Sequence, residues 1–317
     1  LHAGLALHGT GSLGGEVDTG LSYFVQDNYD LFGNRRSLTQ AYGVTYTPSQ
    51  VWSWSANLER GRIVDANDGD SACTAIGFGC RYDSGEGIQG KARLEYRIED
   101  HEDPATSDRK TWAFLASYSN QVSEDWRFLA DIDALVSDSD QEDFLDGRYV
   151  EASLGYAWRP TDNDRWNVLA RYTYLYDLPG SDQISADGTS SGDKQRSHIL
   201  SVDAIYDPDA AWEFGGKLAY RIGETAPRSS DAFTSNDAGL LALRATYAFE
   251  GNWEISGETR LLWLPDAEQT KTGTLLTIYR SFGDHAKVGL GYNFGEFSDD
   301  LRDTKLDDEG LFLNLQA

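Results

Sequence analysis

The sequence has no methionine, only two cysteines and seven prolines in 317 residues, and no long run of apolar side chains. A membrane-spanning helix needs about 18 or more consecutive apolar residues, so the sequence excludes a helical membrane protein. Basic residues are also scarce, because 27 Lys and Arg stand against 52 Asp and Glu, giving a formal charge of -25. Nucleic-acid binding depends on basic side chains that neutralise phosphates, and we therefore expect no nucleic-acid partner.

The two cysteines, Cys73 and Cys80, are seven residues apart within one segment that we expect to be a strand. At about 3.3 Å per residue their Cα atoms would be about 23 Å apart, well beyond the reach of a disulfide. The odd spacing also predicts that they point to opposite faces of the strand. We expect two free thiols and no cofactor. We also expect no metal site, since no His or second Cys pair lies close in sequence.

What the sequence does contain is strict alternation of apolar and polar residues. Apolar residues make up 40% and aromatics 12%, although the mean hydropathy is only -0.51. Period-two alternation is typical of a strand with one apolar and one polar face. In residues 89–98 the apolar face is Gly90, Ala92, Leu94, Tyr96 and Ile98, and the polar face is Gln89, Lys91, Arg93, Glu95 and Arg97. Residues 166–176, 212–222 and 287–294 follow the same pattern.

This alternation predicts sixteen strands, with a further piece of strand at residues 1–9. Most are 10–14 residues long, which exceeds the usual strand of soluble sheets and suits tilted strands that span a membrane. The predicted strands are 16–26, 36–48, 51–64, 73–82, 87–98, 109–120, 125–137, 147–159, 164–177, 194–206, 211–223, 237–250, 252–264, 271–282, 286–297 and 308–317.

The predicted connections alternate between short and long. Short ones include 48–50, 83–86, 122–124, 160–163 and 208–210, and long ones are 27–35, 65–72, 99–108, 138–146, 178–193, 224–236, 265–270 and 298–307. Transmembrane barrels sort their connections in this way, with short periplasmic turns and longer external loops. We therefore predict an all-β fold: one antiparallel up-and-down transmembrane barrel of about 16 strands (range 16–18) over residues 1–317. Residues 1–15 are either an extra strand or the remnant of an upstream segment.

Tryptophan positions support the same fold, because transmembrane barrels carry aromatic belts at both membrane interfaces. Six tryptophans lie close to short turns and two lie at the opposite strand ends, whereas Trp in a soluble core would be spread along the strands. The predicted belts are Trp52, Trp126, Trp158, Trp166, Trp212 and Trp253 at one rim, and Trp112 and Trp263 at the other.

The last predicted strand resembles the C-terminal signal of bacterial outer-membrane barrels. It contains a polar residue, Asp308, a glycine, Gly310, and two alternating apolar residues, Leu313 and Leu315. The resemblance implies recognition by the barrel-assembly machinery. The sequence departs from the commonest form of the signal because it ends at Ala317 and not at Phe.

More broadly, residues 37–317 resemble the C-terminal barrel region of large uncharacterised surface proteins of Gram-negative bacteria, and the chain has the size of a porin. The segments that carry the likeness are 162–166, 171–179, 194–198 and 288–294. The resemblance implies a location in the bacterial outer membrane, with lipid and lipopolysaccharide as partners. It also leaves open an N-terminal passenger domain upstream of Leu1, which we interpret as the start of a mature or trimmed chain.

Sixteen strands enclose a lumen that side chains alone cannot fill. Charges on the polar faces are either determinants of selectivity or pairs that only support a wet structural barrel. The candidates are Lys91, Arg93, Glu95, Arg97, Arg127, Asp131, Asp133, Glu151, Arg171, Asp203, Lys217, Arg221, Arg244, Glu258 and Arg260.

We expect a porin-like channel for passive diffusion of small polar solutes or ions. The alternative is a membrane anchor or translocation barrel for the upstream passenger. By length, residues 178–193 are the best candidate for a lumen plug.

A catalytic role is not expected. Ser197 and His198 lie near the outer end of one predicted strand, but adjacent residues point to opposite faces of a strand. The sequence also has no Gly-x-Ser-x-Gly elbow to present a nucleophilic serine. We predict that the protein is not an enzyme.

Overall fold

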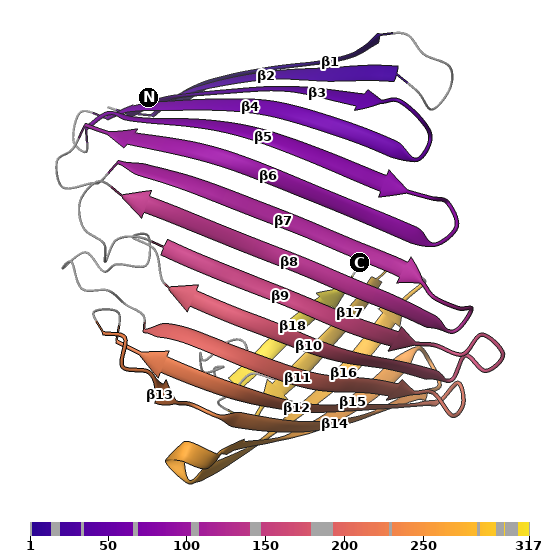
Figure 1. Cartoon of the computed structure of the whole chain (residues 1–317). Helices are drawn as coiled ribbons and strands as arrows, with labels where there is room; N and C mark the ends of the chain where they lie inside the picture. The colour runs from indigo at the N-terminus through magenta and orange to yellow at the C-terminus, as the bar shows by residue number, and fades with distance from the viewer. Residues whose placement is uncertain are drawn as a thin grey trace.

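The computed structural model describes residues 2–13, 20–32, 35–65, 69–102, 108–139, 147–178, 193–227, 230–283, 286–295, 301 and 310–316. These residues form one sheet that curves continuously, so that its last strands, drawn in yellow, lie behind its middle strands (Figure 1). Within the described ranges, no helix is long and apolar enough to cross a membrane.

The predicted all-β fold and strand order are confirmed. Sixteen strands, β2 to β18 without the two-residue β13, correspond in order to the sixteen predicted segments, and β1 covers the strand piece predicted at residues 1–9. The strands are β1 His2–Leu13, β2 Gly20–Phe32, β3 Arg35–Thr47, β4 Trp52–Asp65, β5 Ser71–Asp83, β6 Ile88–His101, β7 Arg109–Gln121, β8 Trp126–Ser139, β9 Gly147–Trp158, β10 Trp166–Leu178, β11 Lys194–Tyr206, β12 Trp212–Ala226, β13 Thr234–Ser235, β14 Ala238–Phe249, β15 Trp253–Leu264, β16 Gln269–Phe282, β17 Ala286–Asn293 and β18 Gly310–Gln316.

The topology is an antiparallel up-and-down meander. Each long strand pairs with the next long strand in sequence, and β12 also pairs with the short β13. Among the described residues β1 pairs only with β2, and β18 pairs only with β17. The backbone hydrogen bonds of the described sheet therefore run in one series from β1 to β18.

The two faces of the sheet differ as the alternation predicts. On β5, Phe78 is 59% exposed, whereas its neighbours Gly77 and Gly79 face the other way and are more covered. Large apolar side chains without a covering layer suit a lipid-facing surface. Cys73 lies opposite Glu99, and Cys80 lies opposite Trp54, so the two thiols occupy different faces. Both cysteines are free, as predicted.

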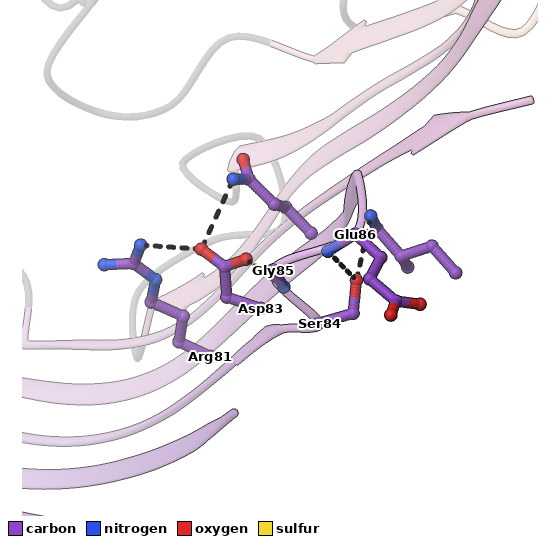
Figure 2. A network of polar contacts seen from close by, with 7 residues as sticks. Arg81, Asp83, Ser84, Gly85 and Glu86 are labelled. Atoms are coloured by element: carbon purple, nitrogen blue, oxygen red, sulfur yellow. Dashed lines mark hydrogen bonds and ion pairs between the residues drawn. The ribbon is translucent and has the colours of Figure 1, made fainter. Parts of the chain in front are cut away.

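The turn between β5 and β6 shows how the short connections close (Figure 2). The Asp83 carboxylate accepts a hydrogen bond from the Gly85 N–H at 3.1 Å and forms an ion pair with Arg81 at 3.3 Å. The Ser84 hydroxyl oxygen accepts from the Glu86 N–H at 3.1 Å. Gly85 has a φ of 72°, a left-handed conformation that glycine adopts without strain. Side chains of Asp and Ser thus replace the ladder partners that the turn residues lack.

Two connections predicted as long are short. Residues 27–32 continue β2 and pair with 35–40 of β3, because the ladder satisfies their backbone groups even where the side chains are polar. Between β15 and β16, Pro265 opens a 3-10 turn (η3, Pro265–Ala267), and Glu268, at φ 52°, completes the reversal. Conversely, the predicted short connection after β9 spans residues 159–165. The alternation of loop length is therefore weaker than the sequence predicts.

Candidate functional site

The ladder register relates all fifteen candidate charges to one face of the sheet. Residues directly opposite one another in an antiparallel pair point to the same face. The row through Lys91 passes Ser117 to reach Asp131, and the row through Arg93 passes Leu115 to reach Asp133. The other rows of β6 to β9 and the equivalent rows from β9 to β15 include the remaining candidates. We call this face the inner face, and we call the face with the exposed apolar residues the outer face.

On the inner face of β6 to β9, two bases on β6 lie across β7 from carboxylates on β8 and β9. Lys91 and Arg93 belong to β6, Asp131 and Asp133 to β8, and Glu151 to β9. Between them lies β7, whose inner-face residues here are Leu115 and Ser117. The five charged residues line a cavity of about 520 Å³, which we call the charge-separated groove. With strands about 4.8 Å apart, the rows on β6 and β8 are about 10 Å apart.

Two carboxylates of the groove, those of Asp133 and Glu151, lie on neighbouring strands. Asp133 lies directly opposite Glu151, an arrangement of like charges that destabilises a sheet unless water or a bound cation solvates it. Glu151 accepts a hydrogen bond from the Tyr149 hydroxyl at 2.6 Å. Within the described part of the chain, no ion pair reaches Lys91, Asp131 or Asp133. The groove therefore presents open positive and negative groups to the same space.

Further along β6 the charges pair with one another. Glu95 accepts from Arg93 at 2.7 Å and from Arg97 at 3.1 Å, and Arg97 also approaches Glu99 at 3.9 Å. These contacts link same-face residues two apart on one strand. They neutralise part of this row, whereas Lys91, at the edge of the groove, has no ion pair with any described residue.

The inner face from β11 to β15 is arranged differently, because opposite charges there are direct neighbours. Arg244 forms an ion pair with Glu213 at 3.0 Å and lies directly opposite Glu258. Arg260 and Glu258 form a second pair, and Lys217 lies directly opposite Asp203. This region matches the interpretation of paired structural charges, whereas the charge-separated groove does not.

Arg221 is fixed in place instead of being exposed to the lumen. It is 6% exposed, and its Nη1 donates to the carbonyl oxygen of Leu301 at 3.0 Å. Its Nη2 donates to the backbone and side-chain oxygens of Asn236, both at 3.2 Å. These three acceptors bind both terminal nitrogens of the guanidinium, which makes Arg221 an anchor for the connection after β17.

Leu301 packs onto the inner face. It belongs to a buried apolar cluster with Ile199, Ala219, Ala238 and Leu240, and Leu262 and Leu264 lie against the cluster. Sequence reasoning missed this contact, because a single leucine in a polar connection has no periodic signal. The predicted plug candidate, residues 178–193, lies outside the described residues except at its two ends.

Two further candidate cations lie on either side of β9. Arg127 donates from Nε to the Gln121 side-chain oxygen at 3.0 Å and borders a cavity of about 490 Å³ beside the short turns. Arg171 lies deeper in the barrel wall, directly opposite Gly155 and Ser201. The small neighbours of Arg171 leave its side chain room to extend over the inner face.

The predicted aromatic belts lie on the outer face at the two rims. At the short-turn rim, Trp126 contacts Trp158 at 6.2 Å between ring centroids, and Trp166 stacks on Tyr206 at 4.3 Å. The other belt residues of this rim are Trp52, Trp212 and Trp253, and those of the long-loop rim are Trp112 and Trp263. The prediction omitted Trp54, which stacks on Trp52 at 5.5 Å. Its spacing of two from Trp52 already placed it on the same face.

The residues of the proposed assembly signal are partly described. Leu313 and Leu315 lie on the outer face of β18 and are 63% and 69% exposed. Gly310 begins β18 opposite Asn293, and Asp308 lies outside the described residues. The last strand thus presents its alternating leucines to the surroundings of the barrel.

No catalytic arrangement forms around Ser197. Its side chain is 3% exposed and lies on the inner face, whereas His198 is on the outer face, where its Nδ1 shares a 2.7 Å hydrogen bond with the Tyr172 hydroxyl. The two side chains therefore cannot act as a nucleophile and its base. Among the described residues, no group of three or more His, Cys, Asp or Glu could hold a metal ion.

Comparisons with known proteins identify the fold. No family model and no curated protein sequence matches the chain. The FrpB iron transporter from Neisseria meningitidis superposes with a TM-score of 0.50 at 12% identity, over 92% of this chain and 62% of that one. The import receptor Fiu from E. coli gives a TM-score of 0.49 at 10% identity (98% and 67% covered), and BamA from Haemophilus ducreyi gives 0.46 at 9% (99% and 70%). The chain therefore spans about two thirds of the length of these proteins. Its fold is that of the Gram-negative outer-membrane β-barrel, and the predicted outer-membrane location agrees with this fold.

Proposed function

We propose that the barrel forms a water-filled channel for passive diffusion of small polar solutes or ions. The observation that carries the proposal is the charge-separated groove, in which Lys91 lies across β7 from Asp131 and Asp133. If the inner face had only a structural role, adjacent opposite charges would stabilise it most, as they do for Arg244 and Glu213. Separated rows are stable only when water solvates them, and rows of opposite sign about 10 Å apart create a field across the water between them.

Such a field favours solutes that carry a dipole or both signs of charge. A carboxylate or phosphate end would lie toward Lys91 and Arg93, and an ammonium end would lie toward Asp131 and Asp133. Ser117 offers a hydroxyl between the rows, and Leu115 would contact an apolar part of the solute. In this proposal selectivity resides in the groove and not in the paired charges of β11 to β15.

Conductance of the purified protein in planar lipid bilayers tests the proposal. We expect ion conductance, and in a salt gradient the Asp131→Asn/Asp133→Asn variant should shift the reversal potential toward anion selectivity. Glu213→Gln, which removes an inner-face carboxylate outside the groove, is the matched control and should shift it much less. Equal shifts of the reversal potential for the two variants would show that the groove does not determine selectivity.

A protein that inserts into bilayers and never conducts would contradict the channel and favour the alternative of an anchor or translocation barrel. Surface exposure of a passenger tests that alternative separately. A passenger encoded upstream of Leu1 should appear on the cell surface only when the barrel is intact. Recognition of Leu313 and Leu315 by the barrel-assembly machinery is part of either proposal, because both functions require insertion.

A further inference from the structure

Three arginines form a cluster on the outer face of β3 and β4, which we call the arginine cluster: Arg36, Arg60 and Arg62. Arg60 and Arg62 are two apart on β4 and therefore share a face. Arg62 lies directly opposite Leu38, and Arg36 is the diagonal neighbour on β3. Diagonal neighbours are about 7–8 Å apart, within reach of long side chains. All three arginines are exposed.

The arginine cluster lies at the level where the membrane-facing surface ends. Arg36 is the second residue of β3, and Arg60 and Arg62 lie close to the end of β4, before the connection at residues 66–70. Toward the short turns, the same face of the same two strands carries exposed Tyr42 and Leu58. Long connections are external in this fold, so the cluster lies at the headgroup level of the outer leaflet.

The charges of the cluster are only partly compensated by the protein. Arg62 pairs with Asp70 at 3.3 Å through a side chain that is 61% exposed. No ion pair to Arg36 or Arg60 forms among the residues whose side chains the structure describes. Neighbouring like charges on a sheet destabilise it, and an anion bound between them removes that cost.

Two other cations at this rim have a carboxylate as a neighbour. Lys110 lies directly opposite Asp138, and Arg196 forms an ion pair with Glu224. The arginine cluster is thus distinguished from these positions by its excess of positive charge, and not merely by its place at the rim.

We infer that the arginine cluster binds a phosphate group of an outer-leaflet lipid. Guanidinium groups donate paired hydrogen bonds to phosphate and match its geometry better than ammonium groups do. Three of them on adjacent strands surround one phosphate from one side, while Tyr42 and Leu58 contact the acyl chains below it. The inference rests on the outer-membrane fold and does not depend on the channel.

The test compares lipopolysaccharide binding to the full chain in nanodiscs, with native mass spectrometry as the measurement. The wild-type protein should retain lipopolysaccharide, and Arg60→Gln/Arg62→Gln should bind it at least about tenfold more weakly, since a charge-assisted hydrogen bond contributes about 1.5–3 kcal/mol. Arg280→Gln is the matched control, because Arg280 lies on the outer face at the opposite rim, over the Trp253 ring. It should bind like the wild type.

Enzymatically dephosphorylated lipopolysaccharide should bind the wild type as weakly as intact lipopolysaccharide binds the double variant. Inorganic phosphate at the same concentration should not compete, because it lacks the acyl chains. Competition by inorganic phosphate would overturn the lipid assignment, and equal binding of intact lipopolysaccharide by wild type and double variant would overturn the site. If the double variant fails to insert, Arg60→Lys/Arg62→Lys preserves the charge and should show an intermediate loss, whereas unchanged binding would again contradict the inference.

Discussion

Arg221 donates a hydrogen bond to the carbonyl oxygen of Leu301, 80 positions later in the sequence, at 3.0 Å. The contact joins the inner face of β12 to the connection between β17 and β18, and the Leu301 side chain packs in the cluster with Leu240. This connection is therefore fastened to the inner face of the barrel wall. Both a charged group and an apolar side chain hold it there.

We expect Arg221→Ala to lower the free energy of unfolding by about 3 kcal/mol, because it leaves one buried and two partly buried acceptors without their charged donor. Urea unfolding in lipid vesicles, followed by Trp fluorescence, measures the change. Arg81→Gln is the control, since Arg81 is exposed and its pair with Asp83 at a turn should contribute less than about 1 kcal/mol. Similar losses for both variants would show that Arg221 is not an anchor.

The two native thiols report on the two faces of β5. In lipid vesicles a membrane-impermeant charged thiol reagent should modify Cys73, which lies on the inner face with Glu99, and leave Cys80 unmodified. A lipid-soluble maleimide should modify Cys80. Mass spectrometry of the variants Cys73→Ser and Cys80→Ser separates the two sites. Rapid labelling of Cys80 by the charged reagent would contradict the assignment of the outer face to lipid.

Gly239 makes room for a belt tryptophan. The two residues lie directly opposite each other, and a Cβ on Gly239 would come within 1.9 Å of Trp263 Cε2. Gly239→Ala should therefore displace the ring and cost about 1–3 kcal/mol through overpacking. Gly90→Ala is the matched control, since the nearest atom to its added Cβ is 3.8 Å away. Thermal unfolding monitored by Trp emission should shift for the first variant and hardly at all for the second.

The pair of Lys194 and Asp231 gives a prediction about pH. Lys194 is 8% exposed and its Nζ is 2.7 Å from Asp231, which lowers the pKa of this carboxyl from its ordinary 3.8 through a hydrogen bond and charge attraction. Because the folded-state pKa lies below the unfolded value, the small stabilisation is complete above about pH 4 and disappears as the pH falls through the lowered pKa. NMR titration should show that Lys194→Met raises the pKa of Asp231 toward 3.8.

A second exposed pair provides the control for that titration. Arg159 hydrogen-bonds Asp164 at 2.6 Å near the opposite rim and also lowers the pKa of its partner. Arg159→Gln should raise the pKa of Asp164 and leave that of Asp231 unchanged. An effect of Lys194→Met on both carboxyls would point to a general change of structure instead of a local pair.

The alternation of residue types was sufficient to predict the strands and their faces. The predicted segment 87–98 covers most of β6, Ile88–His101, and places Lys91 and Ala92 on different faces, because a strand with water on one side and lipid on the other must alternate at every position. The same rule placed Cys73 and Cys80 on different faces. Such information is local, and a single sequence contains it in full.

What the sequence did not predict depends on contacts between distant segments. The separation of Lys91 from Asp131 depends on the register of three strands, and each ladder can slide by two residues without changing the pattern of either strand. The residues next to Leu301 in sequence form no pattern that predicts its packing against β12 and β14. The polarity of residues 27–32 predicts a loop, although the sequence alone does not show that they pair with residues 35–40 of β3.

The strand ladders also differ in length, and this affects how the sheet comes apart. β11 and β12 are paired over 13 positions, whereas β17 and β18 are paired over seven and β16 and β17 over eight. Fewer interstrand bonds mean that the last hairpin opens at a lower cost than the middle of the sheet. We therefore expect the amide protons of β17 and β18 to exchange with deuterium before those of β11 and β12, so that fraying starts at the C-terminal strands.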